Sequence, residues 1–228
     1  NQGNGGGLYC KDGGIVNIKQ NSQFSNNVAE GSSLSNSGNG GGIYADNCQM
    51  NFSELGTLAL DSNSSAQHGG GIFMKSGSVA KFYSATSLNT SATDIGIVNN
   101  RANTNDNKTG DGGGIYLTGS GTRADLHGVF ITGNKAFSGG GIAIMDHALL
   151  SANALTNNCW LRSSCNTITE NKSNPYIGKG GAIYLNNAIA LIQDTHLREN
   201  KAKEGTVFYA ESNSAMTLKN SMIYLNGD

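Results

Sequence analysis

A block of three small residues, one aliphatic residue and usually an aromatic residue recurs along the whole chain of 228 residues. The clearest copy reads Gly-Gly-Gly-Ile-Tyr. Six clear copies and a degenerate seventh begin at Gly5, Gly40, Gly69, Gly112, Gly139, Gly180 and Glu204. Successive copies start 35, 29, 43, 27, 41 and 24 residues apart, so the shortest units approach the mid-twenties and the longer ones carry insertions. This period predicts a solenoid, in which each unit stacks on its neighbours to complete one core.

A second block alternates with the glycine block and consists of an apolar residue, two variable residues and an asparagine. Its asparagines are Asn27, Asn63, Asn100, Asn134, Asn171, Asn200 and Asn226. Two blocks in strict alternation are hard to obtain from composition bias, even in a chain with 33 glycines. The alternation therefore indicates a repeated structural unit.

The segments between the blocks have the character of β-strands. They are short, carry apolar residues at alternate positions, and are bounded by Gly, Asn, Asp and Ser. No segment has a sustained apolar stripe of helical period, which excludes a helical solenoid. We predict an all-β fold: a right-handed parallel β-helix (solenoid) of about seven coils with loop insertions. Residues 1–228 form a single domain, and we expect a piece of a longer protein because the chain starts and stops inside a repeat.

The repeat also predicts where its residues point. The aliphatic residue after the glycines faces inward, and the following aromatic residue lies at the outer face or the next corner. The glycines allow a tight corner without a Cβ clash. The recurrent asparagine tolerates left-handed backbone angles and, in successive coils, stacks into a ladder at one corner.

Three polar insertions, residues 84–94, 103–111 and 152–165, are expected to project as loops from the rod, where repeat proteins usually carry their binding features. The last one contains the only tryptophan. Trp160, with Arg162 beside it, is the candidate binding spot, since an aromatic side chain on a pinned loop can contact protein or sugar. The alternative is that Trp160 covers an exposed part of the core.

The four cysteines favour disulfides over zinc, because they include no Cys-x-x-Cys pair. Cys159 and Cys165 enclose only five residues, and we predict a bridge between them. Cys10 and Cys48 lie in neighbouring repeats but three positions out of register, roughly 10 Å along a strand. They can pair only if a turn intervenes, so a bridge and free buried thiols both remain open.

The composition limits the classes of binding partner that we expect. Lys and Arg total 15 and Asp and Glu total 16, which argues against a nucleic-acid partner. Only 14% of residues are charged, as is common in extracellular β-rich rods. No apolar run is long enough for a membrane-spanning helix.

The two blocks together resemble the passenger region of polymorphic membrane proteins, the chlamydial-type autotransporter adhesins. The resemblance rests on Gly-Gly-Ala/Gly-Ile blocks, as at Gly180, paired with Phe-x-x-Asn blocks, as from Phe24 to Asn27, and it covers essentially the whole chain. The sequence prefers a third Gly over Ala and often replaces Phe by Ile or Leu. The resemblance implies a secreted or surface-exposed β-helix that adheres to a partner.

Parallel β-helices also include polysaccharide lyases and hydrolases, which need clustered carboxylates on one face. The acidic residues here are scattered. Asp146 and His147 are adjacent, and on a strand they would point to opposite faces, so they could cooperate only at a bend. His68 precedes a glycine block, where a turn role is the simpler explanation. We predict no catalytic residues, no metal and no cofactor.

Three functions follow, in order of preference. The first is a non-enzymatic extracellular or cell-surface rod, an adhesin or surface-display passenger that binds a protein or glycan on a host or neighbouring cell. The second is a self-assembling structural protein that associates end to end, because an open β-helix end is an unpaired strand edge. The third is a polysaccharide-active β-helix enzyme.

Overall fold

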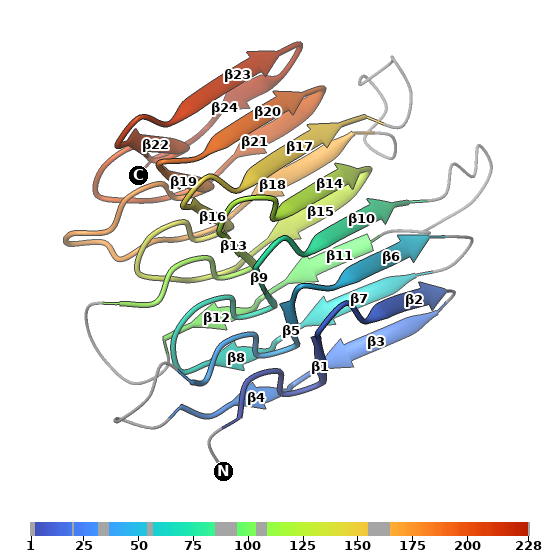
Figure 1. Ribbon diagram of the computed structural model, residues 1–228. Helices are drawn as coiled ribbons and strands as arrows, with labels where there is room; N and C mark the ends of the chain where they lie inside the picture. The colour runs from blue at the N-terminus through green and yellow to red at the C-terminus, as the bar shows by residue number, and fades with distance from the viewer. Residues whose placement is uncertain are drawn as a thin grey trace.

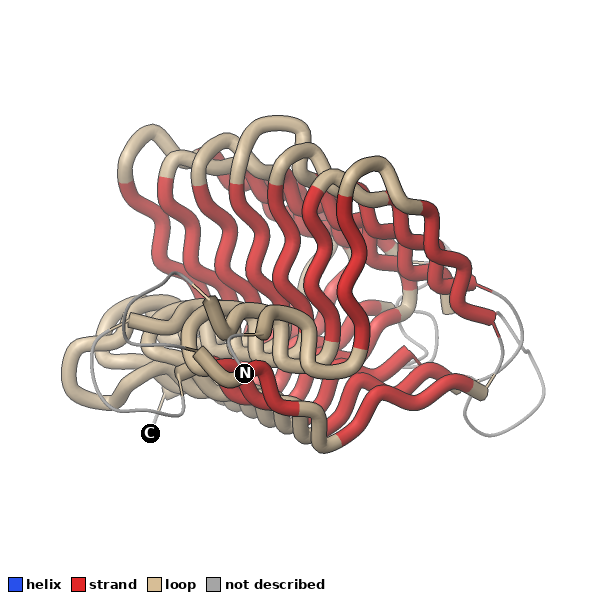
Figure 2. The backbone as a smooth tube through the Cα atoms, turned by 60° about the horizontal axis from the view of Figure 1, so that its bottom comes forward, coloured by secondary structure: helices blue, strands red, loops and turns tan. Residues whose placement is uncertain are grey.

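The computed structural model describes residues 3–19, 21–31, 37–53, 57–84, 95–103, 109–154 and 165–227. The chain winds through seven coils, and each coil adds one strand to each of three parallel sheets (Figure 1). The coils form the predicted right-handed parallel β-helix. In a view across the stacking direction, equivalent strands lie side by side as rows in each wall (Figure 2).

Each of the three long sheets has seven strands, one from every coil. The first sheet contains β1 (Leu8–Lys11), β5 (Ile43–Asp46), β9 (Ile72–Lys75), β13 (Ile115–Thr118), β16 (Ile142–Met145), β19 (Ile183–Asn186) and β22 (Phe208–Glu211). The second contains β2 (Ile15–Lys19), β6 (Gln49–Ser53), β10 (Val79–Tyr83), β14 (Arg123–His127), β17 (Leu149–Asn153), β20 (Ile189–Gln193) and β23 (Ala215–Lys219). The third contains β3 (Ser22–Ser25), β7 (Leu58–Asp61), β11 (Ile95–Val98), β15 (Val129–Thr132), β18 (Asn166–Thr169), β21 (Thr195–Arg198) and β24 (Met222–Tyr224).

A short fourth sheet follows the third in the first three coils. It contains β4 (Val28–Ala29), β8 (Ser64–Ser65) and β12 (Arg101–Ala102). Isolated parallel bridges continue its line through the later coils, from Arg101 to Lys135, Lys172 and Lys201. Successive coils therefore keep one register beyond the named strands.

One continuous core fills the rod. Side chains of β7 and β10 alternate between the interior and the outer face, so every second residue of these strands is buried. The aliphatic residues that follow the glycines stack in register, and Ile43, Ile72 and Ile115 are fully buried. The predicted inward direction of this position is confirmed.

The glycine blocks line a tight corner where two parts of one coil touch. The first glycine of each block has a left-handed backbone, as at Gly69 with φ +65°. The second lies against the chain that follows the asparagine: a Cβ on Gly70 would be 2.4 Å from the carbonyl carbon of Arg101. Only glycine fits such an approach.

The seventh glycine block is displaced by one residue from its predicted position. Phe208, rather than Val207, pairs with Ile183, so the block begins at Gly205 and not at Glu204. The position of the left-handed glycine decides the register, because Gly205 has φ +59° like the first glycine of the other copies.

The recurrent asparagines form the predicted ladder, to which each of the seven coils contributes one asparagine. From Asn63 onward, each side-chain oxygen accepts hydrogen bonds from the backbone N–H and the side-chain amide of the asparagine one coil earlier, as Asn100 does from Asn63 at 3.0 and 2.9 Å. The predicted left-handed angle belongs instead to the preceding residue, for example Asn99 with φ 55°. The asparagine is required for its side chain, because its amide reaches the neighbouring coils.

An aromatic column runs along the outer face of the first sheet. Tyr9, Tyr44, Phe73 and Tyr116 stack with ring centroids 5.0, 5.2 and 5.1 Å apart. Tyr9 is half exposed, but the other three are buried in a second apolar cluster, separate from the main core. His68, in the loop before β9, packs on Tyr116 of this cluster, and loop segments lie beside the strands in Figure 2. The outer-face position was predicted, whereas its burial was not.

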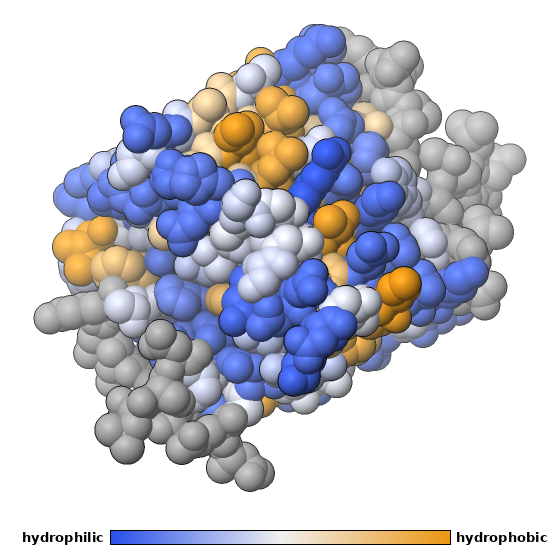
Figure 3. All heavy atoms as spheres, viewed as in Figure 1, coloured by the Kyte–Doolittle hydropathy of each residue, from blue (hydrophilic) through white to orange (hydrophobic). Residues whose placement is uncertain are grey.

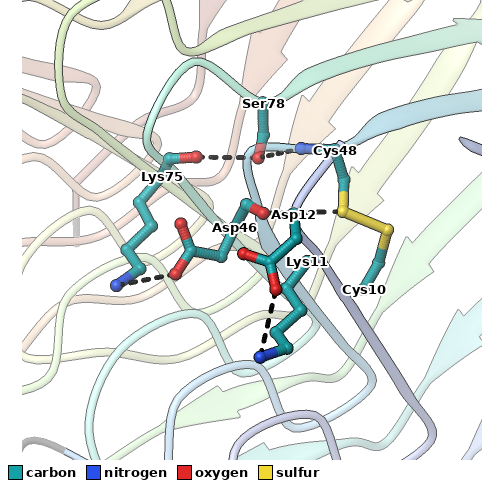
Figure 4. The surroundings of a disulfide bond; sticks show 7 residues. All are labelled: Cys10, Lys11, Asp12, Asp46, Cys48, Lys75 and Ser78. Carbon is teal, nitrogen blue, oxygen red and sulfur yellow. Dashed lines mark hydrogen bonds and ion pairs between the residues drawn. A yellow bond between two sulfur atoms is a disulfide. The ribbon is translucent and has the colours of Figure 1, made fainter. Parts of the chain in front are cut away.

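A disulfide joins the first two coils. Cys10 and Cys48 are bridged, with their Cα atoms 6.2 Å apart. Figure 4 shows the bond between the two sulfur atoms. Cys10 lies in β1 beside Ala45, and the chain turns at Asn47, with φ 55°, before it reaches Cys48. The intervening turn removes the offset of three positions, which settles the question that the sequence left open.

The described residues include no helix long and apolar enough to cross a membrane.

Candidate functional site

The predicted binding residues Trp160 and Arg162 lie outside the described residues, as does Cys159. Cys165, at the end of the same insertion, is fully buried next to β18. The Cys159–Cys165 bridge and the binding role of Trp160 therefore stay predictions.

The two longest insertions at a single corner lie between the second and third sheets. Residues 84–94 connect β10 to β11, and residues 154–165 connect β17 to β18. In two other coils the same corner is crossed by one residue, Gly128 or Asp194, both with positive φ. β11 pairs with β7 and β15 despite its insertion, and β18 pairs with β15 and β21. The insertions therefore add chain at one corner without disturbing the stack.

A pocket of about 300 Å³ lies beside the aromatic column. Its lining residues are Asn39, Tyr44, Gln67, His68, Phe73, Lys75, Tyr116 and Thr118. The His68 ring packs on the Tyr116 ring with centroids 4.5 Å apart, and its Nδ1 accepts a hydrogen bond from the backbone N–H of Asp111 at 3.1 Å. His68 thus ties the loop before β9 to the loop before β13.

Burial controls the ionisation of this pocket. It lowers the pKa of His68 to about 4 and raises the pKa of Asp111 to about 6, although the backbone N–H of Ser138 hydrogen-bonds the Asp111 carboxylate and acts in the opposite direction. Burial also raises the pKa of the Tyr116 phenol. At neutral pH the pocket therefore holds an uncharged imidazole, which suits packing between coils.

Asp146 and His147 do lie at a bend, since both have positive φ, but they do not act as a pair. Asp146 accepts a hydrogen bond from the Thr118 hydroxyl at 2.8 Å, in the coil before. The His147 ring lies 3.3 Å from the amide nitrogen of Asn187, in the coil after. Both side chains are exposed and each contacts a different coil.

Across the described ranges, no group of three or more His, Cys, Asp or Glu side chains could hold a metal ion.

An exposed apolar patch lies on the outer face of the second sheet. Ile189 and Leu191 of β20 are 47% and 42% exposed, and Leu149 of β17 pairs with Ile189. The patch is the largest orange area over β17 and β20 in Figure 3. Patches of this kind contribute to interfaces, although these residues alone do not define a partner.

A groove of about 600 Å³ runs along one edge of the rod, and we call it the basic groove. It is lined by Asn99, Arg101, Gly133, Lys135, Glu170, Lys172, Glu199 and Lys201. These residues occupy two positions of the repeat, directly before and directly after the ladder asparagine. Bridges join the four basic residues in register through four successive coils, so their backbones are about 4.8 Å apart. All four basic residues are exposed.

The sequence indicates this groove through a basic residue that directly follows four of the ladder asparagines. Aligning the asparagine blocks places Arg101, Lys135, Lys172 and Lys201 in one column immediately after the asparagine. The net charge of −1 gives no indication of this column. Its residues are 29 to 37 positions apart in the sequence, and only the fold brings them together.

Residues 21–46 match the family model of the Chlamydia polymorphic membrane protein repeat. The matched segment runs from the beginning of the third sheet in coil 1 to the end of β5, and it contains Asn27 and the glycine block at Gly40. The resemblance noted in the sequence is confirmed at both blocks, and the match indicates a surface-exposed, autotransporter-like protein. No curated protein and no solved structure matches the chain.

Proposed function

We propose that the chain is the non-enzymatic rod of a surface adhesin and binds a protein or glycan on a host or neighbouring cell. The repeat match supports a surface-exposed protein, and the solenoid supplies a stiff support on which binding features are displayed.

The observation that carries the proposal is the corner between the second and third sheets. In two coils this corner carries an insertion of about ten residues, while in two other coils a single residue, Gly128 or Asp194, connects the strands. The strands on either side of both insertions keep their pairing with neighbouring coils, and loops on a rigid support are where binding residues concentrate. Trp160 and Arg162 belong to the second insertion, outside the described residues, and are the side chains that we propose as contacts.

The test is binding of the fluorescently labelled chain to animal cell monolayers. We expect saturable binding that falls about tenfold in the double variant Trp160→Ala/Arg162→Ala, as is typical for anchor residues. The matched control is Lys81→Ala/Tyr83→Ala, which also removes one cation and one aromatic residue, from the outer face of β10, and should bind like the unchanged chain. Absence of saturable binding to any cell surface would contradict the adhesin proposal, and equal loss in both variants would remove the loop from it.

End-to-end association of rods remains a second proposal. The inward-facing Met216, Leu218 and Ile223 of the seventh coil are more than a third exposed, so a further coil or a second copy would bury them. Sedimentation over a wide concentration range distinguishes the two proposals. Growing particle mass that is suppressed by Leu218→Lys supports association, and a constant monomer mass contradicts it.

A further inference from the structure

The basic groove holds like charges in register, and this is unusual within the same rod. Lys11, Asp46 and Lys75 are the last residues of β1, β5 and β9. They occupy one column in the first three coils, and their charges alternate (Figure 4). There the Lys75 ammonium lies 3.0 Å from the Asp46 carboxylate. The Lys11 ammonium lies 3.1 Å from the carboxylate of Asp12, so both lysines of that column pair with carboxylates of the chain.

The groove column has no anion among its own members. It runs Arg101, Lys135, Lys172 and Lys201 through four coils. Among the described residues, no carboxylate lies within ion-pair distance of Arg101, Lys135 or Lys172. Like charges directly opposite one another in neighbouring strands destabilise a sheet. The column therefore opposes stacking in the unliganded rod, and an external anion would relieve that repulsion.

The shape of the column defines the ligand that relieves it. The cations form a straight line along the rod axis, with one charge per coil, in a groove open to solvent. Single exposed ion pairs contribute little, so affinity requires several anionic groups that meet several cations at once. A linear polymer that carries acidic groups at sugar-length intervals satisfies this requirement.

The carboxylates beside the column argue against a nucleic acid. Glu170 and Glu199 line the same groove, and Glu199 lies 2.8 Å from Arg198 on its outer side. A dense phosphate backbone calls for a broad basic face, whereas this chain has a net charge of −1. The groove offers one narrow line of cations bordered by anions.

We propose that the basic groove binds a linear acidic polysaccharide laid along the rod axis, with its carboxylate or sulfate groups paired to Arg101, Lys135, Lys172 and Lys201. This inference rests on the proposed adhesin function and names the glycan class that one wall of the rod recognises. Arg101 at one end adds a bidentate contact, because a guanidinium matches a carboxylate or sulfate with two parallel hydrogen bonds.

The test uses heparin as the sulfated probe, polygalacturonate as the carboxylated probe and dextran as the neutral one, with affinity measured by titration calorimetry. We expect binding of at least one acidic probe, no binding of dextran, and affinity that falls as sodium chloride is raised. The double variant Lys135→Gln/Lys172→Gln should bind at least about tenfold more weakly. The control Lys81→Gln/Lys219→Gln removes two exposed cations from the second sheet and should stay within about twofold of the unchanged chain.

A single charge reversal separates loss of binding from loss of fold. Lys135→Glu makes the column alternate like Lys11, Asp46 and Lys75, so the variant should melt at the same temperature or higher while it loses the acidic glycan. Equal weakening in the control pair, binding of neither acidic probe, or tighter binding of duplex DNA than of both glycans would overturn the proposal.

The two proposals fail separately. If the chain adheres to cells and the groove variants adhere equally well, with no affinity for either acidic probe, the groove proposal is wrong and the adhesin proposal stands. If the chain binds the acidic glycans through the groove but no cell surface, the reverse holds.

Discussion

The side-chain amide of Asn63 donates a hydrogen bond to the side-chain oxygen of Asn100, 2.9 Å away and 37 residues later in the chain. Asn100 repeats the contact with Asn134 at 3.0 Å, and its amide also donates to the backbone carbonyl of Leu60 at 2.8 Å. Each interior ladder asparagine thus uses two donors and two acceptor positions, all between coils. Asparagine alone therefore supplies hydrogen-bond partners for the buried polar groups at this corner, which the sheets do not pair.

Removal of one ladder side chain should therefore be costly. Asn100→Ala deprives the backbone N–H of Asn63, the amide of Asn63 and the carbonyl of Leu60 of partners in a fully buried corner. We expect a loss of about 3–5 kcal/mol in the free energy of unfolding, measured by urea denaturation. The control Asn51→Ala breaks a similar bond to Asn17 on an exposed face and should cost less than about 1 kcal/mol. Equal costs would mean that the ladder contributes no more than a surface contact.

The second glycine of each block should tolerate no side chain. In Gly70→Ala the new Cβ meets the backbone of Arg101 at 2.4 Å, and backbone on both sides prevents relief, so we expect a loss of about 3 kcal/mol or more. Gly77→Ala adds the same methyl group where nothing lies within 4 Å and should cost only about 1–2 kcal/mol for its φ of +80°. Thermal unfolding of the two variants gives the comparison, and a similar fall in melting temperature would contradict the close approach.

The disulfide should act locally. Cys10 and Cys48 are 38 residues apart, so their bridge stabilises the first two coils by about 4 kcal/mol relative to the open chain. Because coils contact only their neighbours, Cys10→Ser/Cys48→Ser should lose hydrogen-exchange protection in β1, β2 and β3 while β17 keeps it. Uniform loss of protection through all seven coils would show that the rod unfolds as one unit.

Burial of His68 and Asp111 makes stability depend on pH in two opposite directions. The pKa of His68 falls to about 4 in the folded chain, so its contribution is present above its usual 6.5 and is lost as pH falls through 4. The pKa of Asp111 rises to about 6, so its contribution is present below its usual 3.8 and is lost as pH rises through 6.

Between about pH 4 and 6 these two contributions to stability change in opposite directions, and single variants should expose each one. Asp111→Asn should lose stability on acidification more steeply than the unchanged chain, whereas His68→Asn should gain stability between pH 6 and 4. Urea midpoints at half-unit intervals measure both slopes. Parallel curves for all three proteins would show that neither group titrates with a shifted pKa.

Much of the fold could be predicted because the two blocks carry strict requirements. An asparagine that bonds to both neighbours and a glycine pressed against backbone admit few substitutes, so all seven asparagines were found from the sequence. The seventh glycine block was misplaced by one residue because only Gly205 retains the pattern there. The sequence could not decide whether Cys10 and Cys48 form a bridge, because the spacing of the strands does not reveal the turn at Asn47.

The candidate sites were harder to predict, since they arise between coils. The pocket at His68 depends on loops that pack over the aromatic column, and the basic groove depends on the register that aligns Arg101 with Lys135. Neither set of residues forms a local motif. The insertion with Trp160 was found from composition alone, and its contacts remain a prediction.

Cysteine cross-linking within the basic groove tests the stacking of the coils most directly. Lys135 and Lys172 are bridge partners in adjacent coils, whereas Lys201 lies one coil further along. The double variant Lys135→Cys/Lys172→Cys should oxidise to an intramolecular disulfide, detected by peptide mass spectrometry, because directly stacked backbones are about 4.8 Å apart. Lys135→Cys/Lys201→Cys, at about twice that distance, should not. A bridge in the second variant, or none in the first, would contradict the register on which the rod, its ladder and its groove depend.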